Sequence, residues 1–160
     1  MIRLLLIIFY ILFPSKSFAL IEVDITRGNL NPLPIAVSPL SIDENSKKNF
    51  EKILKKKNIG EEISIIVENN LKTSGLFNPL NKDAFLQAPD IANLKPRFED
   101  WNLIKAQALI TGKVSFVEEK LRVEFRLWDV LAGKEMIALA FTTVPNNWRR
   151  VGHIITDKVY

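Results

Sequence analysis

Residues 121–128 alternate between apolar and polar side chains more regularly than any other stretch of the chain. The apolar members stand at the odd positions: Leu121, Val123, Phe125 and Leu127. A period of two residues is typical of a β-strand with one face buried and the other in water. Because a slip of one residue would exchange the two faces, this pattern predicts the register of the strand as well as its presence.

Two further strands are expected on either side of this one. The stretch from Ala108 to Phe116 precedes it, and Met136 to Val144 follows it, with short turns at residues 118–120 and 132–134. Gly112 interrupts the first of these strands and indicates a bulge or close packing. Three successive strands joined by short turns predict an antiparallel meander.

The first half of the chain carries shorter strand signals. Leu20–Thr26 alternates between apolar and polar residues, and Pro34–Val37 is an apolar run enclosed by Pro32 and Pro39. Leu76–Leu80 is expected to be extended, since Pro79 disfavours a helical conformation at the residue before it. Together with the meander, these segments predict a mixed sheet of about five strands.

Two longer helices are expected, over Gly60–Ser74 and from Trp148 to the end of the chain. Their apolar residues recur at helical spacing: Ile63, Ile66, Val67 and Leu71 in the first, and Trp148, Val151, Ile155 and Val159 in the second. Gly75 suits a left-handed cap after the first helix, and an asparagine of the Asn146–Asn147 pair suits the N-cap of the second. The predicted fold class is α/β (α+β), with both helices on one face of the sheet.

Shorter features complete the secondary structure. Phe98–Ile104 is expected to form a short helix, and Asp83 to cap a turn. Pro89 and Pro96 are expected to enclose a loop.

The first nineteen residues have the order of a secretory signal peptide. Arg3 is followed by the apolar run Leu4–Phe13 and then by Ser17-Phe18-Ala19, with small residues at both outer positions. The run has ten residues, whereas a membrane-spanning helix needs about 20. We therefore expect cleavage between Ala19 and Leu20, export to the periplasm, and one mature domain over residues 20–160. The leader does not end in cysteine, so a lipoprotein anchor is not supported.

Removal of the leader also changes the charge. The whole chain has 22 basic and 18 acidic residues; loss of Arg3 and Lys16 leaves 20 basic residues against 18 acidic ones. This balance argues against a nucleic-acid partner, which favours a concentrated basic face. Residues 41–58 are polar and rich in lysine. Lys55–Lys57 there could meet an anionic partner, but a solvated loop or frayed helix is the favoured interpretation.

Residues suited to catalysis or metal binding are scarce. The chain has a single histidine, His153, and no cysteine, which excludes metal sites of the histidine-rich or cysteine-rich kind. His153 and Asp157 have the spacing of an ordinary helix-surface pair. No candidate nucleophile with a base and no glycine-rich phosphate loop is present. We expect no catalytic residue, no cofactor and no metal, and therefore a binding module rather than an enzyme.

The three tryptophans differ in their setting. Trp101 and Trp148 fall on apolar helix stripes and are expected in the core. Trp128 lies on the polar face of its strand, so it either packs beneath a loop or contacts a partner. The acidic pairs Glu61–Glu62 and Glu99–Asp100 stand at helix starts, where the helix dipole favours negative charge.

Several segments together carry a resemblance to a known family. They are Leu20–Thr26, Pro34–Val37, Leu71–Phe77 (LKTSGLF), Trp101–Val114 (WNLIKAQALITGKV), Val123–Lys134 (VEFRLWDVLAGK) and Trp148–Tyr160 (WRRVGHIITDKVY). In order and spacing they resemble the amino-terminal domain of the TolB family, the periplasmic component of the Tol-Pal cell-envelope system. The resemblance covers essentially all of the mature chain. Residues 41–60 look longer and more basic than in the family, which suggests an insertion.

The resemblance implies a non-enzymatic adaptor that links inner-membrane TolA to outer-membrane Pal, and so supports outer-membrane integrity and cell division. The family's C-terminal β-propeller, which binds Pal, has no counterpart in this sequence. We expect that the sequence stops at a truncation or a domain boundary. The TolA-binding arm is assigned to the mature N-terminal segment: Leu20, Ile21, Glu22, Val23, Asp24, Ile25 and Thr26. Small-molecule and nucleic-acid partners are not implied, and membranes are met only through these partners.

Two other functional classes remain open at this stage. One is a different exported envelope accessory domain, such as a secretion or synthase-activator factor with a similar core. The other is a periplasmic hydrolase that would have to use His153. Propeller repeats of about 40–45 residues beyond Tyr160 would favour the adaptor.

Overall fold

The computed structural model describes residues 31–160. The expected signal peptide, its cleavage site and the strand expected at Leu20–Thr26 lie outside these residues. The strands are β1 Leu33–Val37, β2 Ser41–Ile42, β3 Phe77–Pro79, β4 Ala108–Val117, β5 Lys120–Asp129 and β6 Lys134–Thr143. The helices are α2 Lys47–Asn49, α3 Ile59–Thr73, α4 Pro89–Leu94, α5 Phe98–Leu103 and α6 Trp148–Val159. Short 3-10 turns are η1 Glu44–Ser46, η3 Lys82–Ala84 and η4 Pro145–Asn147, and η2 Phe50–Leu54 is a π-helical turn.

All six strands belong to one mixed sheet with the order β3-β1-β4-β5-β6, and β2 also pairs with β4. β1 runs parallel to β3 and β4, whereas β4, β5 and β6 form antiparallel pairs. The predicted meander and the mixed α/β class are therefore confirmed. The registers place Val123 of β5 between Val114 of β4 and Phe141 of β6, so the alternating pattern buries the expected face.

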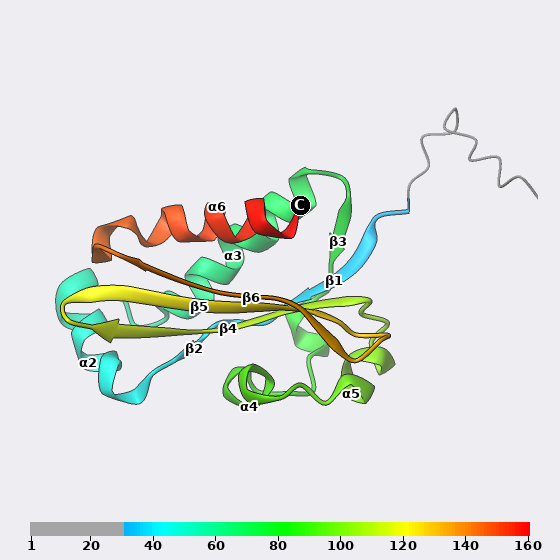
Figure 1. The fold of residues 1–160 in the computed structure, drawn as a ribbon, viewed down its shortest axis with the longest axis horizontal. Coiled ribbons are helices and arrows are strands. Elements are labelled where there is room, and N and C mark those ends of the chain that lie inside the picture. Colours follow the sequence, from blue (N-terminus) through cyan, green and yellow to red (C-terminus); the bar gives the residue numbers. More distant parts are fainter. Residues whose placement is uncertain (1–30) are drawn as a thin grey trace, which may run out of the picture.

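The sheet has helices on both faces (Figure 1). α3 and α6 pack against each other on one face and cover the larger core, as expected. The fully buried members of this core include Ile35, Ile63, Leu71, Leu121, Phe125 and Ile155.

The opposite face carries a smaller core beneath α4 and α5 (Figure 1). Its buried members are Ala36, Ala92, Trp101, Ala106, Leu109 and Val130. The loop expected after Pro89 was wrong, because these residues form α4. Proline is tolerated at the first position of a helix, where the amide hydrogen it lacks would have no intrahelical partner.

The helix ends follow the sequence only in part. Gly75 adopts a left-handed conformation with a φ of 73°, as expected. The cap predicted at Asp83 was wrong: the side chain of Asn81 accepts a hydrogen bond from the Asp83 amide and caps η3. Asn147 is the residue before α6, but its side chain makes no capping hydrogen bond. The side-chain amide of Asn147 donates instead to Thr143 Oγ1.

The bend between β1 and β2 joins the sheet to α3. Val37 pairs with Ile110 and Ser41 pairs with Lys113, so this side of the ladder holds one residue more than β4 does. The extra residue forms a bulge that turns the Leu40 amide away from β4. The Leu40 amide instead donates its hydrogen to the Gly60 carbonyl of α3 at 3.3 Å.

Leu40 is held between two glycines. A Cβ atom on Gly60 would lie 2.0 Å from the Leu40 carbonyl oxygen, and a Cβ atom on Gly112 would lie 2.8 Å from Leu40 Cδ2 and 2.3 Å from the Glu124 carbonyl oxygen. The close packing expected at Gly112 is thus confirmed. Glycine at both positions lets the bend lie against the helix and the sheet at once.

We predict that Gly60→Ala lowers the free energy of unfolding by about 1–3 kcal/mol, which is the usual cost of overpacking a core. At an ordinary glycine in a helix, the same substitution would raise stability, since alanine is more favourable than glycine in a helix by about 1 kcal/mol. Urea unfolding of Gly60→Ala, with the exposed α3 variant Asn69→Ala as control, tests this. A stability equal to or above that of the wild type would contradict the close approach.

Candidate functional site

The arm expected to bind TolA lies outside the described residues, but its point of attachment is well defined. β1 begins at Leu33, which pairs with Phe77 of β3 and donates its amide hydrogen to the Leu76 carbonyl at 2.9 Å. Any chain preceding residue 31 therefore reaches the domain at this end of β1.

The end of α6 lies at the same place. The rings of Tyr160 and Phe77 have their centroids 5.8 Å apart, and the Tyr160 hydroxyl donates to the Asn70 carbonyl at 3.1 Å. The Asn70 side chain in turn donates to Thr156 Oγ1 at 3.2 Å and lies 2.9 Å from His153 Nδ1. These contacts hold the end of α6 on α3, next to the strand that neighbours Leu33.

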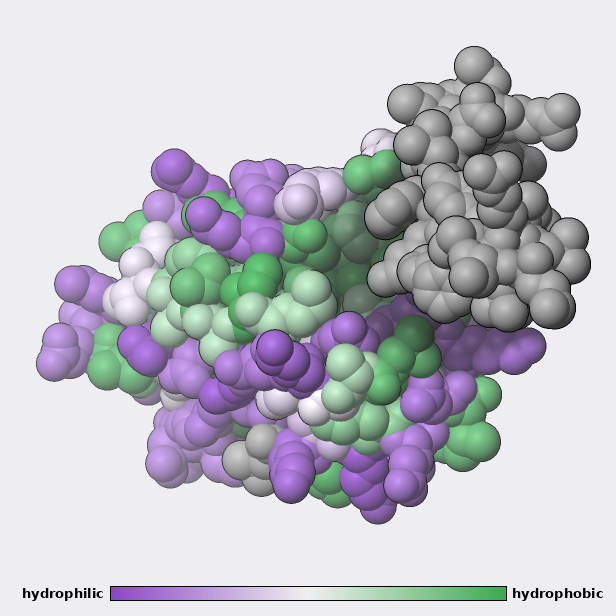
Figure 2. Space-filling model, turned by 45° about the vertical axis from the view of Figure 1, so that its right-hand side comes forward, coloured by the Kyte–Doolittle hydropathy of each residue, from purple (hydrophilic) through white to green (hydrophobic). Residues whose placement is uncertain are grey.

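An apolar hollow, the terminal groove, opens beside this point. Its main apolar lining consists of Leu33, Phe77, Leu127, Leu131, Met136 and Val159, around a cavity of about 240 Å³. Leu131 and Met136 are 69% and 60% exposed, so the groove leaves large apolar side chains open to solvent. Figure 2 shows hydrophobic residues gathered on the adjoining face, which carries β6 and α6. Such a surface suits contact with another chain.

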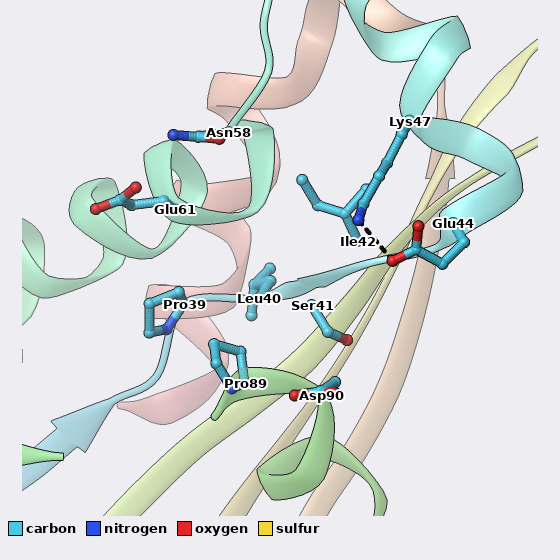
Figure 3. A pocket seen from close by; sticks show the side chains of 10 residues that line it. All are labelled: Pro39, Leu40, Ser41, Ile42, Glu44, Lys47, Asn58, Glu61, Pro89 and Asp90. Carbon is cyan, nitrogen blue, oxygen red and sulfur yellow. Dashed lines mark hydrogen bonds and ion pairs between the residues drawn. The ribbon is translucent and has the colours of Figure 1, made fainter. Parts of the chain in front are cut away.

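A second hollow, the acidic groove, lies beside Leu40 (Figure 3). It encloses about 440 Å³ and is lined by Pro39, Leu40, Ser41, Ile42, Glu44, Lys47, Asn58, Glu61, Pro89 and Asp90. Lys47 pairs with Glu44, while Glu61 comes from the start of α3 and Asp90 from the start of α4. Three carboxylates against one ammonium group favour a cationic ligand.

Asp43 stands at the margin of this groove and ties it to the sheet. Lys113 Nζ on β4 lies 2.8 Å from Asp43 Oδ1, and Ser46 Oγ donates to Asp43 Oδ2 at 3.1 Å. The hydrogen bond from Lys113 is the main cause that lowers the pKa of Asp43 from its usual 3.8. Within residues 31–160, no three or more His, Asp or Glu side chains are grouped so as to hold a metal ion.

His153 lies on an exposed part of α6 and contacts Asn70 across the helix pair. The ion pair that its spacing suggested with Asp157 does not form among the described residues, and the His153 Nδ1 atom lies 2.9 Å from the Asn70 side-chain nitrogen. No described serine or threonine hydroxyl is hydrogen-bonded to the His153 ring, so the geometry offers no activated nucleophile there.

The three tryptophans all pack within the fold. Trp101 and Trp148 are buried, as expected. Trp128 packs beneath the segment that covers the second face: its ring lies 5.8 Å from that of Phe98, and its Nε1 donates to Thr111 Oγ1 at 2.9 Å. Of the two alternatives for Trp128, packing beneath a covering segment is the one observed.

Comparison with known proteins gives the family. Residues 21–136 match the family model described as the TolB amino-terminal domain. The chain belongs to this family. It is 81% identical over 155 residues to the Tol-Pal system protein TolB of Pelagibacter ubique (strain HTCC1062). That match covers 97% of the chain but only 35% of the relative, so the chain spans about a third of the relative's length.

Solved structures agree on the TolB fold. TolB from Acinetobacter baumannii superposes with a TM-score of 0.62 at 20% identity, over 81% of this chain and 27% of that one. Lipoprotein GNA1162 from Neisseria meningitidis superposes with a TM-score of 0.52 at 19% identity, over 80% and 94% of the two chains. The second likeness shows that this fold also occurs outside TolB, so the family rests on the sequence match. No helix within residues 31–160 is both long and apolar enough to span a bilayer.

Sequence reasoning did not find either groove. Glu61 was interpreted only as a helix-start residue, and the acidic groove forms because Pro39, Glu61 and Asp90 meet from three separate elements. The terminal groove likewise joins β1, β3 and α6. A signal that could have pointed to the acidic groove is the glycine at residue 60, which indicates close approach of another backbone.

We predict that Asp43→Asn lowers stability at neutral pH by less than about 1 kcal/mol, as for partly exposed ion pairs. Because the pKa of Asp43 is lowered on folding, the pair stabilises the fold above the unfolded pKa. This contribution is lost as pH falls through the folded pKa, below 3.8. Urea unfolding at pH 7 and near pH 2.5 measures the difference between variant and wild type. A difference that persists at low pH, or matches that of the exposed control Asp157→Asn throughout, would contradict the pairing.

Proposed function

We propose that this chain is the amino-terminal domain of a periplasmic, non-enzymatic adaptor that connects TolA at the inner membrane to Pal at the outer membrane. The observation that carries the proposal is the 81% identity to Tol-Pal system protein TolB over 97% of the chain. Membership of the TolB family supports an envelope role. On this proposal the protein maintains outer-membrane integrity and assists cell division.

The TolA-binding arm is proposed to be Leu20–Thr26. Its alternation of apolar and polar residues suits a strand that adds to the exposed sheet edge of a partner through main-chain hydrogen bonds. The free edge nearest its attachment point is β3, which has three residues, one of them Pro79. Since proline cannot donate to a ladder, this edge offers little to hold an additional strand.

The position of the two chain ends supports coupling between the arm and a following domain. Phe77 pairs with Leu33 on one side and contacts the Tyr160 ring on the other. A domain that follows Tyr160, such as the propeller that the TolB resemblance implies, would therefore begin beside the attachment point of the arm. Binding of Pal to that domain could then alter how accessible the arm is to TolA.

We predict that deletion of Leu20–Thr26 from the mature full-length protein abolishes binding to the periplasmic domain of TolA, as measured by calorimetry. In a matched pair of variants, Ile21, Val23 and Ile25 are changed to serine in one, and Glu22 and Asp24 in the other. The first should weaken binding more, because its side chains would fill the partner's pockets. Unchanged affinity after the deletion would overturn the proposed arm.

Export is proposed to create the free end of this arm. N-terminal sequencing of protein from the periplasmic fraction should begin at Leu20. Ala19→Arg should prevent cleavage, because the peptidase requires a small residue there, and the uncleaved protein should sediment with membranes. A conservative Ala19→Ser control should be processed normally, and a different first residue would contradict the assigned site.

A further inference from the structure

Two runs of basic residues carry a large share of the chain's positive charge. Residues 47–57 hold six lysines and one acidic residue, and Arg149 and Arg150 add two more cations. Of the 22 basic and 18 acidic residues in the chain, 14 basic and 17 acidic residues remain elsewhere. The rest of the protein is thus net acidic.

The fold brings these two runs of charge together. Phe50 is fully buried and packs edge-on against Phe116, which anchors η2 to the sheet. η2 contacts η4, and Lys56 Nζ lies 5.1 Å from the centre of the Trp148 ring. The Arg149 guanidinium lies 4.5 Å from the centre of the same ring. One indole therefore contacts a cation from each run.

Ion pairs neutralise part of this charge, since Lys47 pairs with Glu44, Lys56 with Glu62 and Lys57 with Glu51. The positive end of a helix dipole favours acidic residues, yet the first turn of α6 has none and carries Arg149 and Arg150 instead. Lys55, at the end of η2, holds a left-handed conformation with a φ of 55°, which is uncommon for a residue other than glycine. An anionic surface would neutralise the charges of Lys52, Lys55, Arg149 and Arg150.

An exposed apolar side chain lies within the lysine run. Ile53 is 45% exposed, between Lys52 and Lys55, which are both exposed. Lysines near an anionic membrane are attracted to its phosphate headgroups, and an exposed apolar side chain beside them adds apolar area that can be buried at the headgroup boundary.

We propose that Lys52, Ile53, Lys55, Lys57, Arg149 and Arg150 form a basic surface that binds the anionic phospholipid headgroups of a bilayer. This contact is peripheral and does not depend on the proposed binding of TolA. It departs from the expectation that the protein meets membranes only through its partners. Of the two interpretations favoured for the lysine run, a solvated loop or a frayed helix, the structure shows the helical one over part of its length, anchored by Phe50.

The test is sedimentation of the full mature protein with vesicles of phosphatidylcholine alone or with about a third phosphatidylglycerol. We expect binding only to the anionic vesicles, weakening steeply between about 0.05 and 0.5 M salt. The variant Lys52→Gln/Lys55→Gln/Lys57→Gln should lose about 100-fold in partitioning, from about fivefold per lysine. The matched control Lys72→Gln/Lys95→Gln/Lys134→Gln, which removes three exposed lysines elsewhere, should retain most of its binding.

A second pair of variants separates a bilayer from a soluble polyanion. Ile53→Ser should weaken vesicle binding by about fivefold and leave binding to heparin unchanged, whereas Leu103→Ser, at an exposed site on α5, should affect neither. Equal vesicle binding by the two lysine triple variants would overturn the proposal, as would vesicle binding that does not require phosphatidylglycerol. Loss of vesicle binding with unchanged TolA affinity would show that the two functions are separate.

Discussion

The contact of Leu40 with Gly60 and Gly112 is the constraint on which much of the structure depends. Leu40 belongs to the bulge between β1 and β2, its carbonyl lies against the first turn of α3, and its side chain lies on the central strand β4. No side chain could occupy either glycine position without moving a backbone. This contact sets how α3 crosses the sheet, and α3 in turn supports α6 through Gly152, which lies against Ile66.

The same contact shapes the acidic groove, whose floor is the bend at Leu40 and whose walls are the starts of α3 and α4. The groove is thus a consequence of the bulge. Asp43 and Lys113 then join η1 to β4 just beyond the bend, where Ser46 Oγ also accepts the amide hydrogen of Phe116. Local ion pairing and backbone hydrogen bonding hold this margin in place.

The proposed TolA and membrane contacts lie at opposite ends of α6. Tyr160 lies beside Phe77, the partner of Leu33 in β1, while Trp148 at the other end of α6 contacts Lys56 and Arg149. α6 has twelve residues and so spans about 18 Å. A protein held at a bilayer by its basic surface would therefore leave the terminal groove accessible to a partner. The acidic groove adjoins the lysine run, because Lys47 lines this groove and pairs with Glu44.

Features of the fold that depend on local sequence were predictable. The alternation at Leu121–Leu127 predicted both strand and register, and Gly75 predicted the end of α3, because each depends on neighbouring residues. α4 was missed because six residues that begin with proline carry little helical periodicity. The cap at Asn81 was missed because Asp83 is an equally good capping residue, and only the backbone path distinguishes the two.

By itself, the sequence determined the main elements, the buried face of each and, through its likeness to the TolB family, the kind of role to test. Periodicity and turn chemistry are properties of short segments, so they can be read without knowing the fold. Only the tertiary structure decided that β1 lies between β3 and β4, that Leu33 and Tyr160 end beside the same phenylalanine, and that Lys56 and Arg149 share one indole. These contacts join residues far apart in the chain, and their formation depends on how whole elements pack rather than on any local pattern.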